Sequence, residues 1–283
     1  MANENVRETT TSMPRFSIVT PTLNQVAYLS QTIESVVGQA GAFSIEYRVI
    51  DGGSKDGTVD VLRDWEQRLA GHPKVRFSWM SEADGGQAEA INKGMRQARG
   101  DILAFINSDD FYEPGIFQVV ADRFDRYPDR LWLSGYNRIV DPCGRQIQRP
   151  IFWYKNFWLH LNSPAVLRVL NYISQPATFF RRSAYEIIGP FDEGLHLCMD
   201  YDYWLRLSKF SKPIILKRIV SNFRIHPGSK GKTAFCDQFD EELRVARRYG
   251  RGRTSIVLHK LHNDLIKAVY RYIKGSEDFD CQP

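Results

Sequence analysis

Residues 100–110, GDILAFINSDD, decide the fold, because an apolar run here changes abruptly to polar residues. Every residue from 102 to 106 is apolar, and so short a run is typical of a strand buried in a sheet. The next four side chains are polar: Asn107, Ser108, Asp109 and Asp110. A buried strand that ends in carboxylates predicts ligand-binding groups along one edge of a parallel sheet.

Three similar apolar runs precede this one, over residues 16–20, 45–50 and 75–79. Apolar residues recur at helical spacing between the runs: Leu29, Ile33, Val36 and Val37, then Val61, Leu62, Trp65 and Leu69, then Ala88, Ile91 and Met95. Strands that alternate with helices form βαβ units. The expected fold class is therefore α/β, with a mixed, mainly parallel central sheet flanked by helices.

A polar loop follows each of the four expected strands. The loops begin Pro21-Thr22-Leu23-Asn24, Asp51-Gly52-Gly53-Ser54, Ser81-Glu82-Ala83-Asp84 and Asn107-Ser108-Asp109-Asp110. Ligands of parallel sheets bind beyond the carboxyl ends of the strands. Four polar loops at one edge therefore indicate a binding site.

The second half of the chain is less regular. Residues 141–144 have turn chemistry and are expected to join two antiparallel strands. Residues 175–181 resemble a strand, and residues 200–207 resemble a short helix. The aromatic segment 152–158 is interpreted as core packing, and no site is assigned to it.

The composition narrows the class of protein. The 283 residues suffice for one large α/β domain or two small ones, and the hydrophobic share of 43% is ordinary. The four cysteines lie far apart, without the paired spacing of a zinc site or a disulfide framework. No segment resembles a signal peptide or a membrane span. These features favour a protein of a reducing cytoplasm.

Asp109 and Asp110 are neighbours at a strand end, so their side chains should point to opposite sides. One carboxylate could accept hydrogen bonds from a ribose while the other holds a divalent metal. Oxygen ligands suit Mg²⁺ or Mn²⁺, which keep positions for water and substrate phosphates. The alternative is a solvated turn that caps a helix before Phe111. The three companion loops favour the ligand site.

Two further residues have candidate roles. Asp51 precedes Gly52 and Gly53, which let a flat ligand approach the backbone, so its carboxylate could accept an N–H of uracil or guanine. His226 lies in FRIHPGSKGK (residues 223–232), a loop that could close over a pyrophosphate and bring His226 to a metal or phosphate. The alternative for His226 is an ordinary surface loop.

Seven strings in the chain resemble family 2 glycosyltransferases in order and spacing. They are SIVTPTLN, VIDGGSKDGT, ADGGQAEAINKG, GDILAFINSDD, QPATFFRR, GPFDE and MDYDYWLRL. The resemblance extends from about residue 16 to residue 207. It implies a GT-A fold, an inverting reaction and a nucleotide-sugar donor.

The resemblance also assigns roles to residues. We expect the nucleotide to contact Pro21, Leu23, Asn24, Asp51, Gly53, Asp84 and Asp109. The metal ligands are expected among Asp110, Asp109 and His226, with Asp110 preferred as the direct ligand. Asp200 matches the catalytic base of the family, and Gln175 is a candidate contact of the donor or acceptor sugar.

The chain departs from the family pattern at two positions. Leu23 stands where many members have an aromatic residue, so stacking on the base is weaker or supplied elsewhere. Met199 stands where many have Glu, directly before the base, and Asp202 is therefore a rival for that role. Helical spacing puts Asp200 and Asp202 on different faces, which favours Asp200 and leaves Asp202 as a partner for Arg181, Arg182 or Arg206.

The C-terminal helix is amphipathic. From Leu258, its apolar residues are Leu261, Leu265, Val269 and Tyr272, and its basic residues are Lys260, Lys267, Arg271 and Lys274. One interpretation is a surface helix packed on the domain. The other is an interfacial helix attracted to anionic lipid, which suits a lipid-linked acceptor on the inner face of the membrane.

Together these observations predict an inverting transferase that uses a UDP-sugar, Mn²⁺ or Mg²⁺ and a saccharide or lipid-linked saccharide acceptor in polysaccharide or glycolipid synthesis. Nucleic acid is not an expected partner. The alternative is a non-catalytic nucleotide-binding or scaffold protein of a polysaccharide assembly complex. We expect a flexible tail over 1–14, a catalytic domain over 15–225 with nucleotide-binding (15–110) and acceptor (111–225) halves, and a C-terminal loop with basic helices over 226–283.

Overall fold

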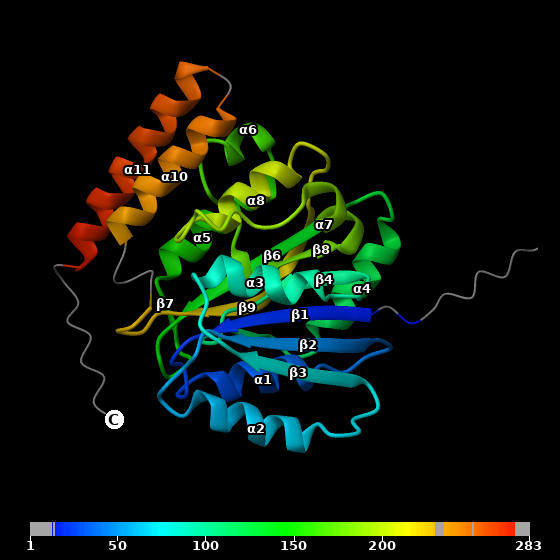
Figure 1. The fold of residues 1–283 in the computed structure, drawn as a ribbon. Coiled ribbons are helices and arrows are strands. Elements are labelled where there is room, and N and C mark those ends of the chain that lie inside the picture. Colours follow the sequence, from blue (N-terminus) through cyan, green and yellow to red (C-terminus); the bar gives the residue numbers. More distant parts are fainter. Residues whose placement is uncertain (1–12, 14, 230–234, 251, 275–283) are drawn as a thin grey trace, which may run out of the picture.

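A computed structural model of the protein describes residues 13, 15–229, 235–250 and 252–274 (Figure 1). The expected tail lies outside the described residues except for residue 13, as do Lys230 and Lys232 of the His226 loop. The described residues build a nine-stranded sheet with helices on both of its faces.

The first four strands lie where the sequence predicts them. They are β1 (Arg15–Thr22), β2 (Ser44–Asp51), β3 (Val75–Ser81) and β4 (Ile102–Phe105). β1 pairs with β2 and with β4, and β2 pairs with β3, all in parallel. Because the four strands run in one direction, their carboxyl ends meet at one edge of the sheet.

The second half of the chain adds strands of both directions. They are β5 (Phe111–Tyr112), β6 (Trp132–Val140), β7 (Gln146–Ile147), β8 (Thr178–Arg181) and β9 (Ile214–Arg224). β8 is antiparallel to β4 and β6, whereas β6 and β9 are parallel. The strand order is β3-β2-β1-β4-β8-β6-β9-β5, and β7 pairs with β6. The mixed α/β sheet is confirmed.

Two local predictions for the second half have different outcomes. The turn at 141–144 does join the antiparallel strands β6 and β7, and Gly144 adopts a φ of +80°, where glycine is favoured. The strand expected over 175–181 begins later, after the 3-10 turn η1 (Gln175–Ala177). Pro176 explains this difference, because it has no N–H to donate to a neighbouring strand.

Two hydrophobic cores separate the helices into layers. The core on one face contains residues of α1 (Leu29–Val37), α2 (Thr58–Arg68) and α4 (Ile116–Arg126). The core on the other face contains residues of α3 (Gln87–Arg96), α5 (Arg149–Leu161), α6 (Pro164–Leu167), α7 (Arg182–Ile188) and α8 (Met199–Leu207). Figure 1 shows α3 and α8 on the side of the sheet opposite to α1 and α2.

The position of α8 is fixed by an aromatic stack. Trp204 of α8 stacks on Trp132 of β6, with ring centroids 5.7 Å apart and planes 7° apart. Both rings are fully buried, and burial of one such side chain stabilises the fold by roughly 2–3 kcal/mol. The helix that carries Asp200 is thus held rigidly on the sheet.

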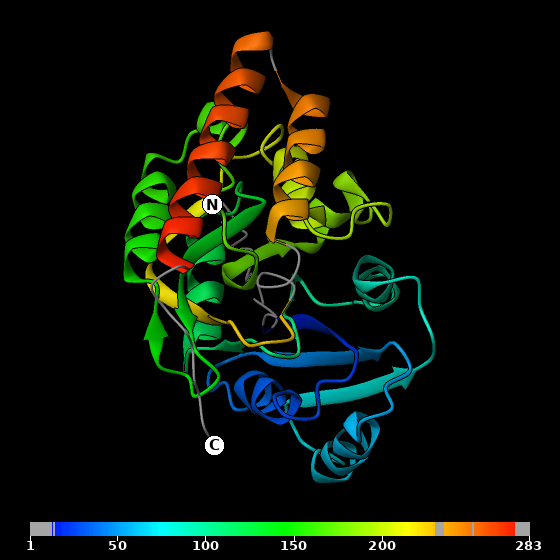
Figure 2. The ribbon, with the colours of Figure 1, turned by 90° about the vertical axis from the view of Figure 1, so that its left-hand side faces the viewer.

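Two C-terminal helices, α10 (Phe235–Tyr249) and α11 (Arg253–Lys274), lie side by side (Figure 2). α10 contacts both α8 and α11. α11 packs on the domain through a polar face, where His259 and Asn263 are buried, whereas Leu261 and Leu265 are 60% and 61% exposed. The apolar stripe is therefore not what holds α11 in place. None of the described helices is long and apolar enough to cross a bilayer.

Candidate active site

Hydrogen bonds join the polar loops at the carboxyl ends of β1, β2 and β3. The backbone N–H of Asn24 donates to the Ser54 hydroxyl at 2.7 Å, which links the first loop to the second. The Ser81 hydroxyl donates to the Asp51 carboxylate at 2.6 Å, which links the third loop to the second. The loops that the sequence places at one edge therefore form one continuous surface.

Asp51 is fully buried at the centre of this surface. Its Oδ2 accepts from the backbone N–H groups of Gly53 and Ser54, at 3.1 and 3.0 Å, and from Ser81. Its Oδ1 accepts from the Ser54 hydroxyl. Gly53 has a φ of +88°, which favours glycine. In this structure Asp51 organises its loop, and its carboxylate accepts hydrogen bonds from groups of the protein itself.

The other expected nucleotide contacts surround Asp51. Pro21 is buried, whereas Leu23 is 54% exposed and offers an apolar surface. Asn24 has a positive φ and accepts the Lys55 N–H through its side-chain oxygen at 2.9 Å. Asp84 approaches Gly52 so closely that a Cβ there would lie 3.1 Å from the Asp84 carboxylate. Gly52 thus lets the second and third loops pack together.

Asp109 and Asp110 point in different directions, but strand alternation is not the cause, because β4 ends at Phe105 and both residues lie in the loop that follows. The Asp109 Oδ2 lies 3.0 Å from Nε2 of His226, and its side chain is partly exposed. Asp110 is fully buried and accepts the backbone N–H of Arg224 at 2.8 Å. Burial and the neighbouring Asp109 raise the pKa of Asp110 well above its usual range. In this geometry Asp109 is the more accessible carboxylate, and the preference for Asp110 as direct metal ligand stays a prediction.

Asp109 and His226 together can hold a divalent cation. The Nδ1 of His226 accepts the Gly228 N–H at 3.3 Å, which leaves Nε2 directed at Asp109. Among the described residues, no cluster of three or more His, Cys, Asp or Glu side chains is placed to bind a metal. Two protein ligands still fit a cation of the Mg²⁺ type, because such ions complete their coordination with substrate phosphates and water.

Arg224 holds this part of the site together. Its Nε donates to the Asp109 carbonyl at 2.8 Å, and its guanidinium lies over the rings of Tyr28 and Phe111, at 4.7 and 5.2 Å. Tyr28 also contacts the His226 ring, at 4.8 Å between centroids. Sequence reasoning gave no role to Arg224. The signal that could have identified it is an arginine between the apolar residues Phe223 and Ile225, directly before His226.

Asp200 is the second residue of α8, and its side chain is partly exposed. Burial raises its pKa to about 6, although the Tyr201 N–H and the charge of Lys155 oppose this rise. A carboxylate with such a pKa is well matched to proton transfer near neutral pH. Lys155 is another residue that sequence reasoning missed, since it lies in the aromatic segment 152–158, to which no site is assigned.

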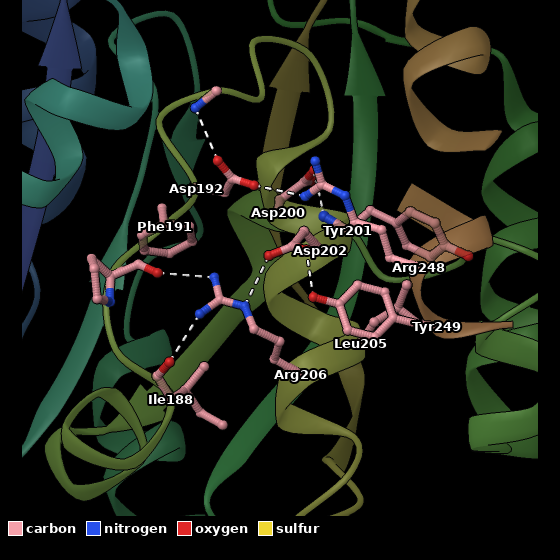
Figure 3. A network of polar contacts seen from close by, with 12 residues as sticks. Ile188, Phe191, Asp192, Asp200, Tyr201, Asp202, Leu205, Arg206, Arg248 and Tyr249 are labelled. Carbon is pink, nitrogen blue, oxygen red and sulfur yellow. Dashed lines mark hydrogen bonds and ion pairs between the residues drawn. The ribbon is translucent and has the colours of Figure 1, made fainter. Parts of the chain in front are cut away.

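Asp202 lies in a different environment (Figure 3). Its Oδ2 accepts from Arg206 Nε at 2.8 Å, and its Oδ1 accepts from the Tyr249 hydroxyl at 2.7 Å. Its side chain is 3% exposed. Both oxygens of Asp202 have partners within the protein, so it serves as the expected partner of Arg206 and is a poor rival to Asp200 as the base.

Comparisons with known proteins show the family. Residues 17–189 match the family described as glycosyl transferase family 2. An uncharacterised glycosyltransferase of Mycobacterium tuberculosis is 31% identical over 217 residues, which are 75% of this chain and 76% of that protein. The chain belongs to glycosyl transferase family 2. It is therefore a transferase that acts on nucleotide sugars, and this membership sets the non-catalytic alternative aside.

Two solved structures confirm the GT-A fold of this family 2 glycosyltransferase. The mannosyltransferase PcManGT from Pyrobaculum calidifontis, in complex with GDP-Man and Mn²⁺, has a TM-score of 0.67 at 17% identity and covers 95% of this chain and 77% of that chain. TarS 1-349 of S. aureus, in complex with UDP-GlcNAc, has a TM-score of 0.61 at 18% identity and covers 82% and 65%. At such low identity the likeness concerns the fold alone.

Gln175 of this glycosyltransferase lies beside the fourth polar loop. Its Nε2 donates to the carbonyl of Phe105, the last residue of β4, at 2.7 Å. Gln87 at the start of α3 donates to Asn107 at 2.6 Å, which links the third and fourth loops. Gln175 therefore borders the site, and Asn107 and Gln87 are polar residues of the site to which sequence reasoning gave no role.

Proposed function

We propose that this glycosyltransferase moves a sugar from a nucleoside diphosphate donor to an acceptor hydroxyl with inversion, and that Asp200 is the base. The observation that carries the proposal is the contrast within α8: Asp200 is partly exposed and has a pKa of about 6, whereas both oxygens of Asp202 accept hydrogen bonds from Arg206 and Tyr249.

The chemistry requires a base because a hydroxyl is a weak nucleophile until its proton is removed. The Asp200 carboxylate takes this proton as the acceptor oxygen attacks the anomeric carbon, and the bond from that carbon to the diphosphate oxygen breaks. A single displacement inverts the anomeric configuration. Asp109 and His226 would hold the divalent cation, with Mn²⁺ favoured over Mg²⁺ by the imidazole nitrogen. When bound, the cation stabilises the charge of the departing diphosphate.

The favoured donor is a UDP-sugar. Among the residues that the structure describes, only the Ser54 hydroxyl donates to the Asp51 Oδ1, so the N–H of a uracil could replace that hydroxyl and exchange one hydrogen bond for another. The exposed Leu23 would cover one face of the base. Leu23 is smaller than an aromatic ring, and a pyrimidine needs less contact area than a purine.

The acceptor is proposed to be a lipid-linked saccharide at an anionic membrane surface. α5 exposes Trp153, Phe157 and Leu161, spaced by four residues on one face. α11 exposes its own apolar stripe: Val257, Leu258, Leu261, Leu265 and Val269. The Tyr154 hydroxyl of α5 and Nε2 of His262 on α11 lie 2.6 Å apart, next to both stripes. This contact places α5 beside α11, and the exposed residues of the two stripes are together called here the apolar face.

Charge complementarity selects an anionic lipid surface as the partner of the apolar face. No aspartate or glutamate lies between Asp141 and Glu186, a segment that contains all of α5. In α11 the one acidic residue is Asp264, against several lysines and arginines. Apolar side chains, tryptophan included, with basic flanks are typical of surfaces that lie in the membrane interface.

A vesicle sedimentation assay tests the membrane proposal. Wild-type protein is expected to bind phosphatidylglycerol vesicles more strongly than phosphatidylcholine vesicles, and less strongly at high salt. The triple variant Trp153→Ser/Phe157→Ser/Leu261→Ser should lose this binding. The double variant Phe210→Ser/Ile187→Ser removes exposed apolar side chains elsewhere and should keep it. Equal binding by both variants would contradict the proposal. It would also be contradicted if the wild-type protein forms a dimer and the triple variant loses that dimer but still binds vesicles.

The transfer reaction is tested by the configuration of its product. The protein is incubated with Mn²⁺, an α-linked UDP-hexose or GDP-mannose, and a panel of saccharide and lipid-linked saccharide acceptors. The proposal predicts a β-linked product from a UDP-sugar, identified by the NMR coupling of the anomeric proton. An α-linked product would mean retention, and the single displacement with Asp200 as base would then be wrong.

A further inference from the structure

Glu241 of α10 is a buried carboxylate directed at the chain that leads into α8. Its Oε2 accepts the backbone N–H groups of Leu197 and Cys198, at 2.7 and 2.8 Å, and its Oε1 accepts that of His196 at 3.2 Å. The side chain is 4% exposed. Three backbone donors on one buried carboxylate form a specific anchor between elements that are distant in sequence.

This anchor lies where α8 has no cap of its own. α8 begins at Met199, and its N-cap residue Cys198 makes no side-chain capping hydrogen bond. The N–H groups at the start of a helix have no partners within the helix and attract negative charge. Glu241 supplies an acceptor to the residues that lead into α8, and Asp200 follows two residues after the last of them, Cys198.

Glu241 remains charged in this position. Burial tends to raise its pKa, but the N–H groups of residues 196–198 outweigh burial, so that the pKa of Glu241 is lowered. Arg244, one turn further along α10, lies 3.5 Å from Oε1 on the exposed side. The hydrogen bonds are therefore charge-assisted, and such bonds are shorter and stronger than neutral ones.

We propose that Glu241 is the positioning residue for the base Asp200, which makes α10 a working part of the active site although it lies beyond the residues matched to the family. The proposal rests on the assignment of Asp200 as the base. Glu241 fixes the first turn of α8 against the sheet, and Asp200 projects from that turn. A small displacement of a reacting group is enough to cost a large part of the rate.

The charged groups around Asp200 come from two other helices. Lys155 of α5 favours the ionised form of Asp200, and Glu241 of α10 disfavours it. Glu242, next to Glu241, is buried, and its Oε1 accepts from Asn171 at 3.1 Å. The charges of Asp200 and Glu242 also affect each other, since Asp200 raises the pKa of Glu242. Removal of the Glu241 charge therefore alters the protonation of Asp200 as well as its position.

The test compares Glu241→Gln and Glu241→Ala with the matched control Asp240→Asn. Asp240 is the preceding residue of α10, and its side chain is 74% exposed and pairs with Lys267. Glutamine keeps one acceptor oxygen, so Glu241→Gln should reduce kcat by about tenfold or more and Glu241→Ala by a larger factor. KM for the donor and the Mn²⁺-dependent Kd for UDP should stay within about twofold. Asp240→Asn should behave as wild type.

The pH profile separates positioning from mere support of the fold. Because the Glu241 charge raises the pKa of Asp200, Glu241→Gln should move the acid limb of kcat/KM to lower pH. Wild-type kcat in Glu241→Gln, or a parallel loss of kcat, UDP binding and Tm, would overturn the proposal. If Asp200→Asn itself transfers sugar at the wild-type rate, the base assignment fails instead. If Glu241→Gln lowers kcat alone and Asp200→Asn is inactive, both the positioning role of Glu241 and the assignment of Asp200 as the base are supported.

Discussion

Asp200 and Asp202 both lie on the first turn of α8, but Asp200 is partly exposed whereas Asp202 is buried and paired. Substitution of each residue should therefore have a different effect. Asp200→Asn should lower kcat by on the order of 10²–10⁴-fold, the usual contribution of a general base, with Tm and UDP binding unchanged. Asp202→Asn leaves Arg206 without its buried partner and should destabilise the fold by about 3 kcal/mol. Steady-state kinetics and thermal unfolding of both variants check this. A stable but inactive Asp202→Asn beside an active Asp200→Asn would reverse the assignment.

The pKa of Asp200 predicts the pH dependence of transfer. A base must be deprotonated to act, so kcat/KM should fall as the pH decreases through about 6. Lys155 lowers the pKa of Asp200 by its positive charge, so Lys155→Met should raise that pKa and move the acid limb to higher pH. Lys93→Met, which removes a lysine paired with Glu82 and Glu89, is the control and should leave the limb in place. An unmoved limb in Lys155→Met would show that Asp200 does not control it.

At the residue scale, the sequence predicts which residues are candidates for the site better than it predicts which way their side chains point. Strand alternation does not apply to Asp109 and Asp110, because β4 already ends at Phe105, and the sequence does not say which of the two faces the site. That choice depends on β9, whose Arg224 donates its backbone N–H to Asp110 from 114 residues away in sequence. The burial of Asp51 has a similar origin, because Ser81 of another strand occupies one of its oxygens.

Among the helices, α3 approaches the sheet closely enough to exclude a methyl group. A Cβ on Gly94 of α3 would lie 2.5 Å from Cγ1 of Val19 in β1. Gly94→Ala should therefore destabilise the fold by about 1–3 kcal/mol, even though alanine is the better helix former. Chemical denaturation of Gly94→Ala, Val19→Ala and the double variant measures this. The double variant should lose less stability than the sum of the losses of the two single variants. If the two losses simply add, the close contact is contradicted.

At the element scale, periodicity predicted the strands and helices of the first half, since βαβ units repeat a local pattern. The second half was harder because its strands pair over long distances and in both directions, as β8 does with β4 and β6. Periodicity also does not predict which way the apolar stripe of α11 faces. An amphipathic pattern predicts two faces, and only packing against α5 and α10 shows which one is buried.

The whole molecule brings elements of the C-terminal region to a site defined by the N-terminal strands. Glu241 of α10 accepts hydrogen bonds from the backbone that leads into α8, and we propose the apolar face of α5 and α11 as the surface near the acceptor. The sequence predicted that polar loops meet at one edge of the sheet and that Asp200 lies at the start of a helix, because these residues belong to motifs that follow strands or begin a helix. The contributions of Lys155, Arg224 and Glu241 were not predictable, since each depends on a contact between distant parts of the chain.

We expect the loops at the carboxyl ends of β1–β4 to bind a nucleoside diphosphate together with a metal held by Asp109 and His226. Calorimetric titration with UDP and with GDP, each with Mn²⁺ and with a chelator, tests it most directly. We predict that UDP binds more tightly than GDP and that binding requires Mn²⁺. Asp109→Asn should abolish the binding of UDP, whereas Asp240→Asn should not. Binding of neither nucleotide with Mn²⁺, or equal binding in chelator, would contradict the account.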